Sequence, residues 1–202
     1  MTEMLPLFPL SMVLFPGCRV PLHIFEERYR LMIGECVENG TEFGLVRGSD
    51  DDFAEIGCAA RVADVVNRFA DGRMNVIVEG TDRIRISDRQ DDQPYITGTV
   101  ERIPDEESEP ADDLVEATHE LYVEALKLSV GWYRAPSTQD QPFGAMSYAI
   151  GSSLGLPPDI QQKLLEDTSI PGRFEQLREA LENVLGGLRD HARKTSGNGK
   201  VH

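Results

Sequence analysis

Cys18, His23 and Glu26 are the residues of this sequence whose types and spacing could do chemistry. They lie within the stretch LFPGCRVPLHIFEERYRLM, residues 14–32. A thiol, an imidazole and a carboxylate are the groups that a cysteine hydrolase uses as nucleophile, general base and orienting group. Such a site also requires the thiol and the imidazole to meet in space, with an oxyanion hole beside them. One hypothesis is therefore an uncharacterised hydrolase built on Cys18, His23 and Glu26.

The same stretch also has the pattern of a structural element. Phe25, Tyr29, Met32 and Cys36 recur at steps of four, three and four, which predicts a helix with these residues on its buried face. The helix is expected to stop near 39–40, an Asn-Gly pair. We favour this structural interpretation over the catalytic one, because nothing in the sequence specifies that the thiol meets the imidazole.

The residues around this helix have structural explanations too. Glu26 and Arg30 form an i, i+4 pair in the favourable order, and Glu26 and Glu27 are expected in the first turn, where the helix dipole favours acidic side chains. Pro16-Gly17 predicts a turn, and RVPLHIF (19–25) predicts a short extended segment that leads into the helix.

Composition excludes several classes of protein. The chain has 202 residues and a formal charge of −15, and both halves are acidic. Nucleic-acid binding draws on Lys and Arg at phosphates, so this class is disfavoured. Apolar runs are short and interrupted, which argues against a membrane span. The N-terminal stretch contains Glu3, Pro6 and Pro9, and these residues do not fit a secretory signal peptide.

Cofactor and metal motifs are absent from the sequence. Neither G-x-x-x-x-G-K-[ST] nor G-x-G-x-x-G occurs. The three cysteines, at 18, 36 and 58, share no close-pair spacing, and the four histidines are not i, i+3 or i, i+4 partners of one another, which argues against a zinc site. We expect no cofactor, no metal, and reduced thiols in a cytoplasmic protein.

Hydrophobic periodicity divides the chain into two parts. Residues 104–113, PDEESEPADD, form an acidic linker between a strand-rich part, residues 1–103, and a helical part, residues 114–190. The tail, 191–202, lacks an apolar period and is expected to be flexible. Short strands are predicted at 42–46, 61–69, 74–78, 83–87 and 95–103, with turns at Asp71-Gly72, at Gly80 and at 88–94. This pattern predicts an antiparallel barrel or sandwich.

Four helices are predicted in the second part. The first carries Leu114, Thr118, Leu121, Ala125 and Leu128 on one face. Two shorter helices are expected over 143–154 and 159–166, the second with Ile160, Leu164 and Leu165 inward. The last helix, with Ser169 as N-cap and Pro171 in its first turn, carries Phe174, Leu177, Leu181, Val184 and Leu188. Together they predict an α+β protein in which a small bundle packs against the barrel.

The order of these pieces resembles the Lon protease N-terminal domain, over about residues 4–185. The likeness rests on LPLFPLSMVLFPGCRVPLHIFEERYRLM, on VIVEGTDRIRI and on LPPDIQQKLLEDTSIPGRFEQLREAL. It implies a PUA-like β-barrel with one early helix and then a helical bundle, a domain that also occurs in cereblon. Matching positions imply structural roles for Pro16, Gly17, Pro21, Phe25, Arg28, Tyr29, Gly80 and Arg83, and no catalytic residue.

In Lon this domain helps to recognise unfolded or tagged proteins, while separate ATPase and peptidase modules do the chemistry. The sequence contains neither module, so the resemblance implies a non-catalytic module that binds unfolded polypeptide, or a protease or client protein, in proteolysis or protein quality control. Trp132 and Tyr133 beside a loop, with Phe143 and Met146, are candidate peptide-contacting residues. The hydrolase hypothesis and RNA binding by a PUA-like barrel remain alternatives. The sequence does not distinguish a monomer from a weak dimer.

Overall fold

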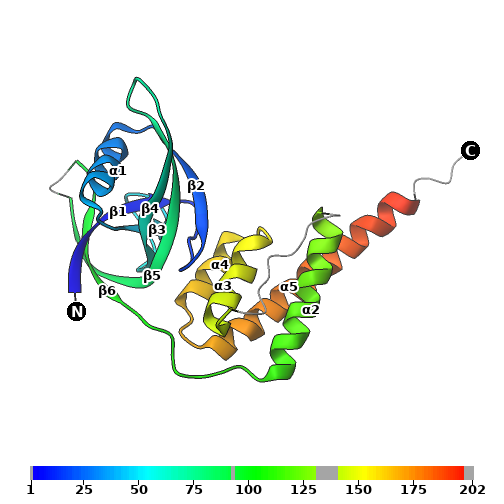
Figure 1. Cartoon of the computed structure of the whole chain (residues 1–202). Coiled ribbons are helices and arrows are strands. Elements are labelled where there is room, and N and C mark those ends of the chain that lie inside the picture. Colours follow the sequence, from blue (N-terminus) through cyan, green and yellow to red (C-terminus); the bar gives the residue numbers. More distant parts are fainter. Residues whose placement is uncertain (1, 92–93, 131–140, 198–202) are drawn as a thin grey trace, which may run out of the picture.

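The computed structural model describes residues 2–91, 94–130 and 141–197, which form a β-barrel followed by a helical bundle (Figure 1). The strands are β1 (Thr2–Leu10), β2 (Arg19–Ile24), β3 (Phe43–Arg47), β4 (Ile56–Arg68), β5 (Met74–Gln90) and β6 (Thr97–Arg102). The helices are α1 (Glu27–Asn39), α2 (Asp112–Val130), α3 (Phe143–Ser153), α4 (Pro158–Glu166) and α5 (Ile170–Gly197). The predicted α+β class is confirmed.

The barrel closes through one long strand. Strands β5, β4, β3, β1 and β6 are neighbours in that order, and β6 pairs again with β5. β2 adds to the sheet along residues 74–79 of β5. The described pairs are antiparallel except β1 with β3, which is parallel. That pair departs from the antiparallel barrel that the sequence predicts, because the chain passes through β2 and α1 before it returns beside β1.

Gly80 is part of a strand, which corrects the predicted turn. The segments expected as two strands, 74–78 and 83–87, are both in β5. Pro16 forms a bridge with Gly80, and the Gly80 N–H donates to the carbonyl of Cys18 over 3.0 Å. A Cβ at Gly80 would lie 2.4 Å from the backbone oxygen of Phe15. Glycine therefore permits the close approach of the 15–18 turn, in which Gly17 has φ +75°.

Helix α1 confirms three of the four predicted buried positions and corrects the fourth. Tyr29, Met32 and Cys36 are buried, whereas Phe25 is 61% exposed. The helix begins only at Glu27, so Phe25 lies before it and does not follow the helical spacing. Ile24, the last residue of β2, takes the buried position instead.

The predicted Glu26–Arg30 pair is absent and each residue has another partner. Glu26 is the N-cap residue of α1, outside the regular helix, and its carboxylate accepts from Arg28 over 3.0 Å. Arg30 donates to the backbone carbonyl of Asp71 in the β4–β5 turn. Arg28 also pairs with Asp50, which accepts from the Tyr29 hydroxyl over 3.0 Å, so this part of α1 is tied to the segment after β3.

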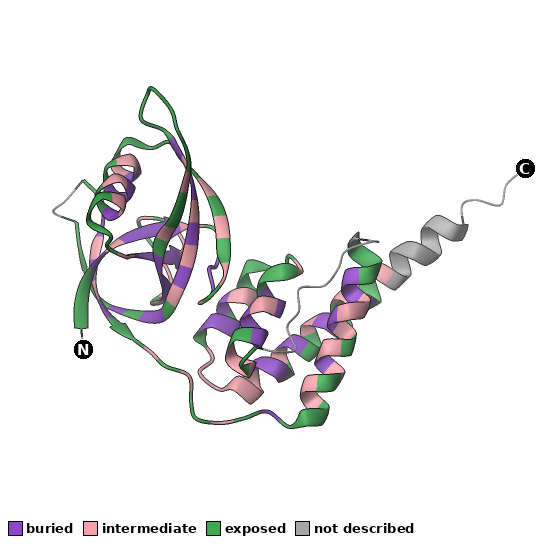
Figure 2. Ribbon diagram, in the orientation of Figure 1, coloured by how far each residue is buried: buried purple, intermediate pink, exposed green. Residues whose placement is uncertain are grey.

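The bundle has its own core, in which the apolar faces of the four helices meet (Figure 2). Leu164, Leu165, Phe174, Leu177 and Leu181 are buried as predicted. The Oγ of Ser169 accepts the Gly172 N–H over 3.2 Å, which confirms the predicted N-cap. Leu128 is 48% exposed, contrary to prediction, and its neighbours Lys127 and Ser129 are exposed as well.

Two buried arginines join the barrel to the bundle. Arg83 on β5 is 2% exposed and Arg173 on α5 is fully buried. The Asp105 carboxylate accepts from Arg83 over 3.0 Å and from Arg173 over 2.6 Å. Arg83 also donates to the Tyr148 hydroxyl over 2.9 Å, and the Phe15 ring stacks on Tyr148 with centroids 5.3 Å apart. Arg83 therefore ties β5 to the linker and to α3.

The expected linker and tail differ from their predicted character. Asp105 anchors the linker to both arginines, and the Glu106 N–H donates to the backbone oxygen of Thr168 over 3.0 Å. The linker is thus anchored to the bundle at Asp105 and Glu106, while most of its residues are exposed. Helix α5 continues to Gly197, past the expected boundary at 190. Within the described residues, no helix is long and apolar enough to span a bilayer.

Candidate functional site

Cys18 and His23 are not brought together. Cys18 precedes β2 and His23 lies five residues further along this extended segment, which separates their Cα atoms by roughly 16 Å. The His23 Nδ1–H donates to Oδ1 of Asn75 over 2.6 Å, and the Glu26 carboxylate is paired with Arg28. These contacts correct the hypothesis of a hydrolytic site built on the three residues.

The Cys18 thiol packs against the bundle. Its Sγ lies 3.5 Å from Oγ of Ser152 on α3, and burial raises the pKa of the thiol despite this hydrogen bond. A raised pKa disfavours the thiolate, which is the nucleophilic form. Among the described residues, no three His, Cys, Asp or Glu side chains lie close enough together to hold a metal ion.

The four predicted peptide-contacting residues fall into two groups. Trp132 and Tyr133 lie outside the described residues, so their role stays a prediction. Met146 is 4% exposed in the bundle core, and Phe143 packs edge-on against Phe174 with ring centroids 6.3 Å apart. Met146 therefore offers no surface to a peptide, because the inward face of α3 is used to build the core.

An aromatic cluster, His23, Phe25 and Phe69, lies on the barrel surface where β2 ends beside the β4–β5 turn. The His23 and Phe25 rings stack with centroids 6.0 Å apart, and the Phe69 ring is edge-on to His23 at 6.2 Å. Phe25 is 61% exposed and Phe69 is 37% exposed. Exposed aromatic rings in contact with one another are a common feature of protein-binding surfaces.

Polar side chains contact two of the three rings of this cluster. Asn75 fixes the His23 ring, as described above. Arg73 lies over the Phe69 ring, with its guanidinium carbon 5.3 Å from the centroid, and its Nε–H donates to the Asp71 carboxylate over 2.7 Å. The His23 and Phe69 rings therefore have polar neighbours that favour their positions, which reduces the entropy cost of contact with a partner.

A hollow, the junction cleft, lies between the barrel and the bundle. Its volume is about 550 Å³, and it is lined by Ser11, Arg47, Gly48, Asp52, Phe53, Ala54, Pro158, Gln162 and Glu166. Arg47 of β3 pairs with Asp159 of α4 across the junction. The cleft therefore exists only because α4 is docked against the end of β3.

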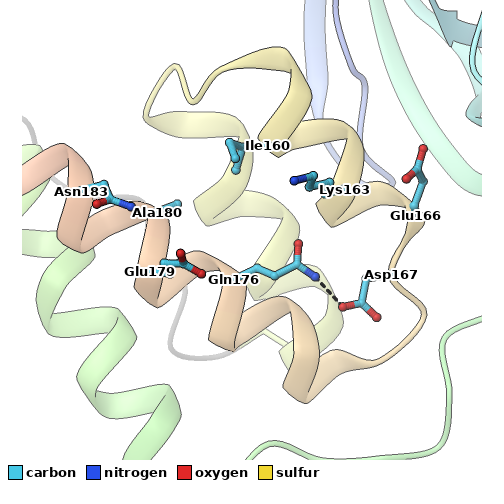
Figure 3. A pocket seen from close by; sticks show the side chains of 8 residues that line it. All are labelled: Ile160, Lys163, Glu166, Asp167, Gln176, Glu179, Ala180 and Asn183. Carbon is cyan, nitrogen blue, oxygen red and sulfur yellow. Dashed lines mark hydrogen bonds between the residues drawn. The ribbon is translucent and has the colours of Figure 1, made fainter.

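A second hollow, the α4–α5 groove, has a volume of about 490 Å³ (Figure 3). Its apolar residues are Ile160 and Ala180, and its polar residues are Lys163, Glu166, Asp167, Gln176, Glu179 and Asn183. Gln176 donates to the Asp167 carboxylate over 2.6 Å. Glu166 belongs to both hollows, and Figure 3 shows its carboxylate directed away from Gln176 toward the barrel strands.

The sequence patterns did not reveal these surfaces. The helical spacing predicts a buried position for Phe25, and the strand pattern places Phe69 at the end of a predicted strand. The signal that could have found them was the Asp71-Gly72 turn, since a tight turn after Phe69 leaves little chain to cover it. The junction cleft could not be found in this way, because its residues come from three separate segments.

Comparison with known proteins places this geometry in a family. Lon protease of Flavobacterium johnsoniae is 28% identical over 193 residues, which cover 88% of this chain and 23% of that protein. Lon protease 2 of Syntrophobacter fumaroxidans is 24% identical over 203 residues, which cover 90% of this chain and 24% of that protein. The chain thus spans about a quarter of the length of these relatives.

Solved structures have the same arrangement of barrel and bundle. The crystal structure of the Lon N-terminal domain protein from Xanthomonas campestris superposes with a TM-score of 0.69 at 27% identity, covering 87% of this chain and 96% of that one. The N-terminal domain of Mycobacterium avium complex Lon protease superposes with a TM-score of 0.68 at 20% identity, over 89% and 98% of the two chains. The model of the ATP-dependent protease La (LON) substrate-binding domain matches residues 4–183, and this chain belongs to that family.

Proposed function

We propose that this protein binds extended segments of protein substrates, and that the aromatic cluster of His23, Phe25 and Phe69 is a contact surface for them. The observation that carries the proposal is the exposure of aromatic rings that contact one another on a chain of the substrate-binding family. The proposal includes a role in proteolysis or protein quality control, as an adaptor or substrate receptor, and the similarity to proteins named Lon protease supports this part of it. The proposal does not include catalysis by Cys18 and His23, because the thiol and the imidazole are held apart.

The exposed surface of Phe25 supports a modest affinity. A phenylalanine side chain buries about 200 Å², so its 61% exposure leaves roughly 120 Å² for a partner to cover. At about 25 cal/mol per Å² this is worth about 3 kcal/mol before the cost of ordering the ligand. An unfolded polypeptide loses much entropy on binding, so we expect a Kd of micromolar order or weaker.

The test is a fluorescence anisotropy titration with labelled lysozyme that has been reduced and carbamidomethylated, in parallel with labelled single-stranded RNA. Phe25→Ala is expected to weaken lysozyme binding about fivefold or more. Leu128→Ala is the matched control, since Leu128 is 48% exposed and lies on the bundle, away from the cluster. Trp132→Ala in the same series tests the other proposed contact.

The outcomes separate the hypotheses. Binding of the unfolded lysozyme that Phe25→Ala weakens and Leu128→Ala does not would support both the function and the surface. Equal binding by all variants would remove the aromatic cluster as the contact site. Binding of RNA that falls steeply as salt rises, with no response to lysozyme, would refute the proposed function in favour of RNA binding.

A further inference from the structure

Strand β2 has one edge that no other described strand pairs with. β2 stands at the end of the strand order, and β5 is its neighbour on one side (Figure 1). Arg19, Pro21 and His23 are exposed, while the alternate residues of β2 pack on the barrel core. A strand edge of this kind offers backbone donors and acceptors to another extended chain. We call it the β2 edge.

The hydrogen-bond pattern shows which backbone groups lie on the β2 edge. The Gly80 N–H donates to the Cys18 carbonyl over 3.0 Å, so these two opposite residues form a hydrogen-bonded pair. In an antiparallel pair of strands, bonded positions alternate with non-bonded ones. The backbone groups of Arg19, Pro21 and His23 therefore point away from β5. Within the described residues, the N–H groups of Arg19 and His23 have no hydrogen-bond partner.

Pro21 lies in the middle of this edge and agrees with that assignment. Proline lacks an N–H, so a sheet accommodates it where its nitrogen faces away from the neighbouring strand. The nitrogen of Pro21 faces the free side, and no hydrogen bond to β5 is lost. The β2 edge thus presents the carbonyls of Arg19, Pro21 and His23 and the N–H groups of Arg19 and His23.

Pro21 and the net charge favour a different polypeptide over a second copy of this chain as the occupant. Two paired β2 edges would contain two prolines and would lack two donors. A segment with ordinary amide groups would lack one. Two copies would also bring together two chains that each carry a formal charge of −15, which repel each other.

The β2 edge leads into the aromatic cluster. His23 lies on the edge, and its ring stacks on that of Phe25. In an added strand, the residue opposite His23 has its side chain on the same face, with the two Cβ atoms about 5 Å apart. An apolar or aromatic side chain at that position contacts both rings. The other end of the edge is open as well, since the side chain of Arg19 is 65% exposed.

We propose that an extended segment of a bound polypeptide adds to β2 as a further strand, with an apolar or aromatic residue over His23 and Phe25. This proposal rests on the proposed function and adds the way in which the ligand backbone is held. Backbone hydrogen bonds supply affinity that does not depend on sequence, and alternate side chains supply preference. This combination suits unfolded segments that share little sequence.

The first experiment tests the backbone bonds of the ligand. A labelled nine-residue peptide of threonine, serine and glutamine carries a central phenylalanine, and its other amides are N-methylated one at a time. Anisotropy titrations give the Kd of each peptide. Only every second amide of an added strand faces β2. On the side of the phenylalanine that pairs with β2, we expect losses of about fivefold or more at alternate positions and of about twofold or less between them.

Variants of the protein test whether the strand is added at β2. Pro21→Thr provides another N–H on the β2 edge and removes no bond to β5, so it should tighten peptide binding about threefold or more. Pro158→Thr, at an exposed position of α4, is the control and should leave the Kd unchanged. Arg19→Pro removes an N–H from the edge and should weaken binding about fivefold. Arg19→Ala removes the same side chain but keeps the N–H, and it should bind as the wild type does.

The outcomes distinguish strand addition from the proposed function. Alternating losses, with opposite effects of Pro21→Thr and Arg19→Pro, would establish strand addition at β2. Losses without alternation, or alternating losses with no response to the edge variants, would overturn it and leave polypeptide binding intact. The same holds for binding of unfolded lysozyme without binding of the peptide. If neither binds, the proposed function and strand addition are both refuted.

Two controls complete the design. Far-UV circular dichroism and urea midpoints check that each variant folds, and the N-methylated peptides test the wild-type protein in any case. Sedimentation velocity measures self-association of the wild type. A dimer that the peptide dissociates would assign the β2 edge to a second copy and overturn the proposal.

Discussion

Replacement of Asp105 by asparagine is the sharpest test of how the two parts of the fold are held together. Asp105 is the carboxylate between Arg83 and Arg173, which are 2% and 0% exposed, while its own side chain is 27% exposed. Removing one partner of a buried ion pair costs about 3–5 kcal/mol, because the remaining charge stays buried. Partial exposure of Asp105 and the surviving carbonyl acceptors of Arg83 place the expected loss near the lower limit, at about 3 kcal/mol.

The assay is urea denaturation followed by far-UV circular dichroism. With a denaturant dependence of about 2 kcal/mol per molar urea, the midpoint should fall by about 1.5 M. Asp159→Asn is the matched control, since Asp159 pairs with Arg47 across the same junction but is 77% exposed. Exposed pairs contribute less than about 1 kcal/mol. Equal losses for the two variants would refute the reasoning from burial.

The same carboxylate predicts a dependence on pH. Burial alone would raise the pKa of Asp105, but the hydrogen bonds and charges of Arg173 and Arg83 outweigh it and lower the pKa. The unfolded chain therefore takes up this proton at a higher pH than the folded protein. The stabilisation is complete above the unfolded pKa of about 4 and is lost as pH falls through the folded pKa. The difference between wild type and Asp105→Asn should accordingly shrink below pH 4.

Three further predictions concern single residues. Gly80→Ala should lower the free energy of unfolding by about 1–3 kcal/mol in urea titrations, because its Cβ would approach the Phe15 oxygen to 2.4 Å; an unchanged midpoint would contradict this contact. Tyr29→Ala should lower the free energy of unfolding by about 3–5 kcal/mol and Phe25→Ala by less than about 1 kcal/mol, because Tyr29 is buried and Phe25 is exposed. A larger loss for Phe25→Ala than for Tyr29→Ala would contradict these exposures. Cys18 should react slowly with iodoacetamide at pH 7, and Cys18→Ser should bind polypeptide as the wild type does; rapid alkylation with loss of binding would revive a role for the thiol.

The local elements of this protein were determined by the sequence alone. Tyr29, Met32 and Cys36 have the helical spacing, Gly40 ends the helix in a left-handed conformation, and Asp71-Gly72 joins two strands. These features depend on residues within a few positions of one another. Short-range spacing and backbone preference therefore suffice to predict them. The family and the order of barrel and bundle followed from the same local patterns.

The candidate sites were decided by the tertiary structure. Phe25 is exposed because Ile24 fills the core position before the helix starts, and the composition of 104–113 gave no sign that Asp105 lies between two buried arginines. Each of these environments is created by segments far apart in the chain. Periodicity records which face of an element is apolar, whereas the partner of that face depends on long-range packing.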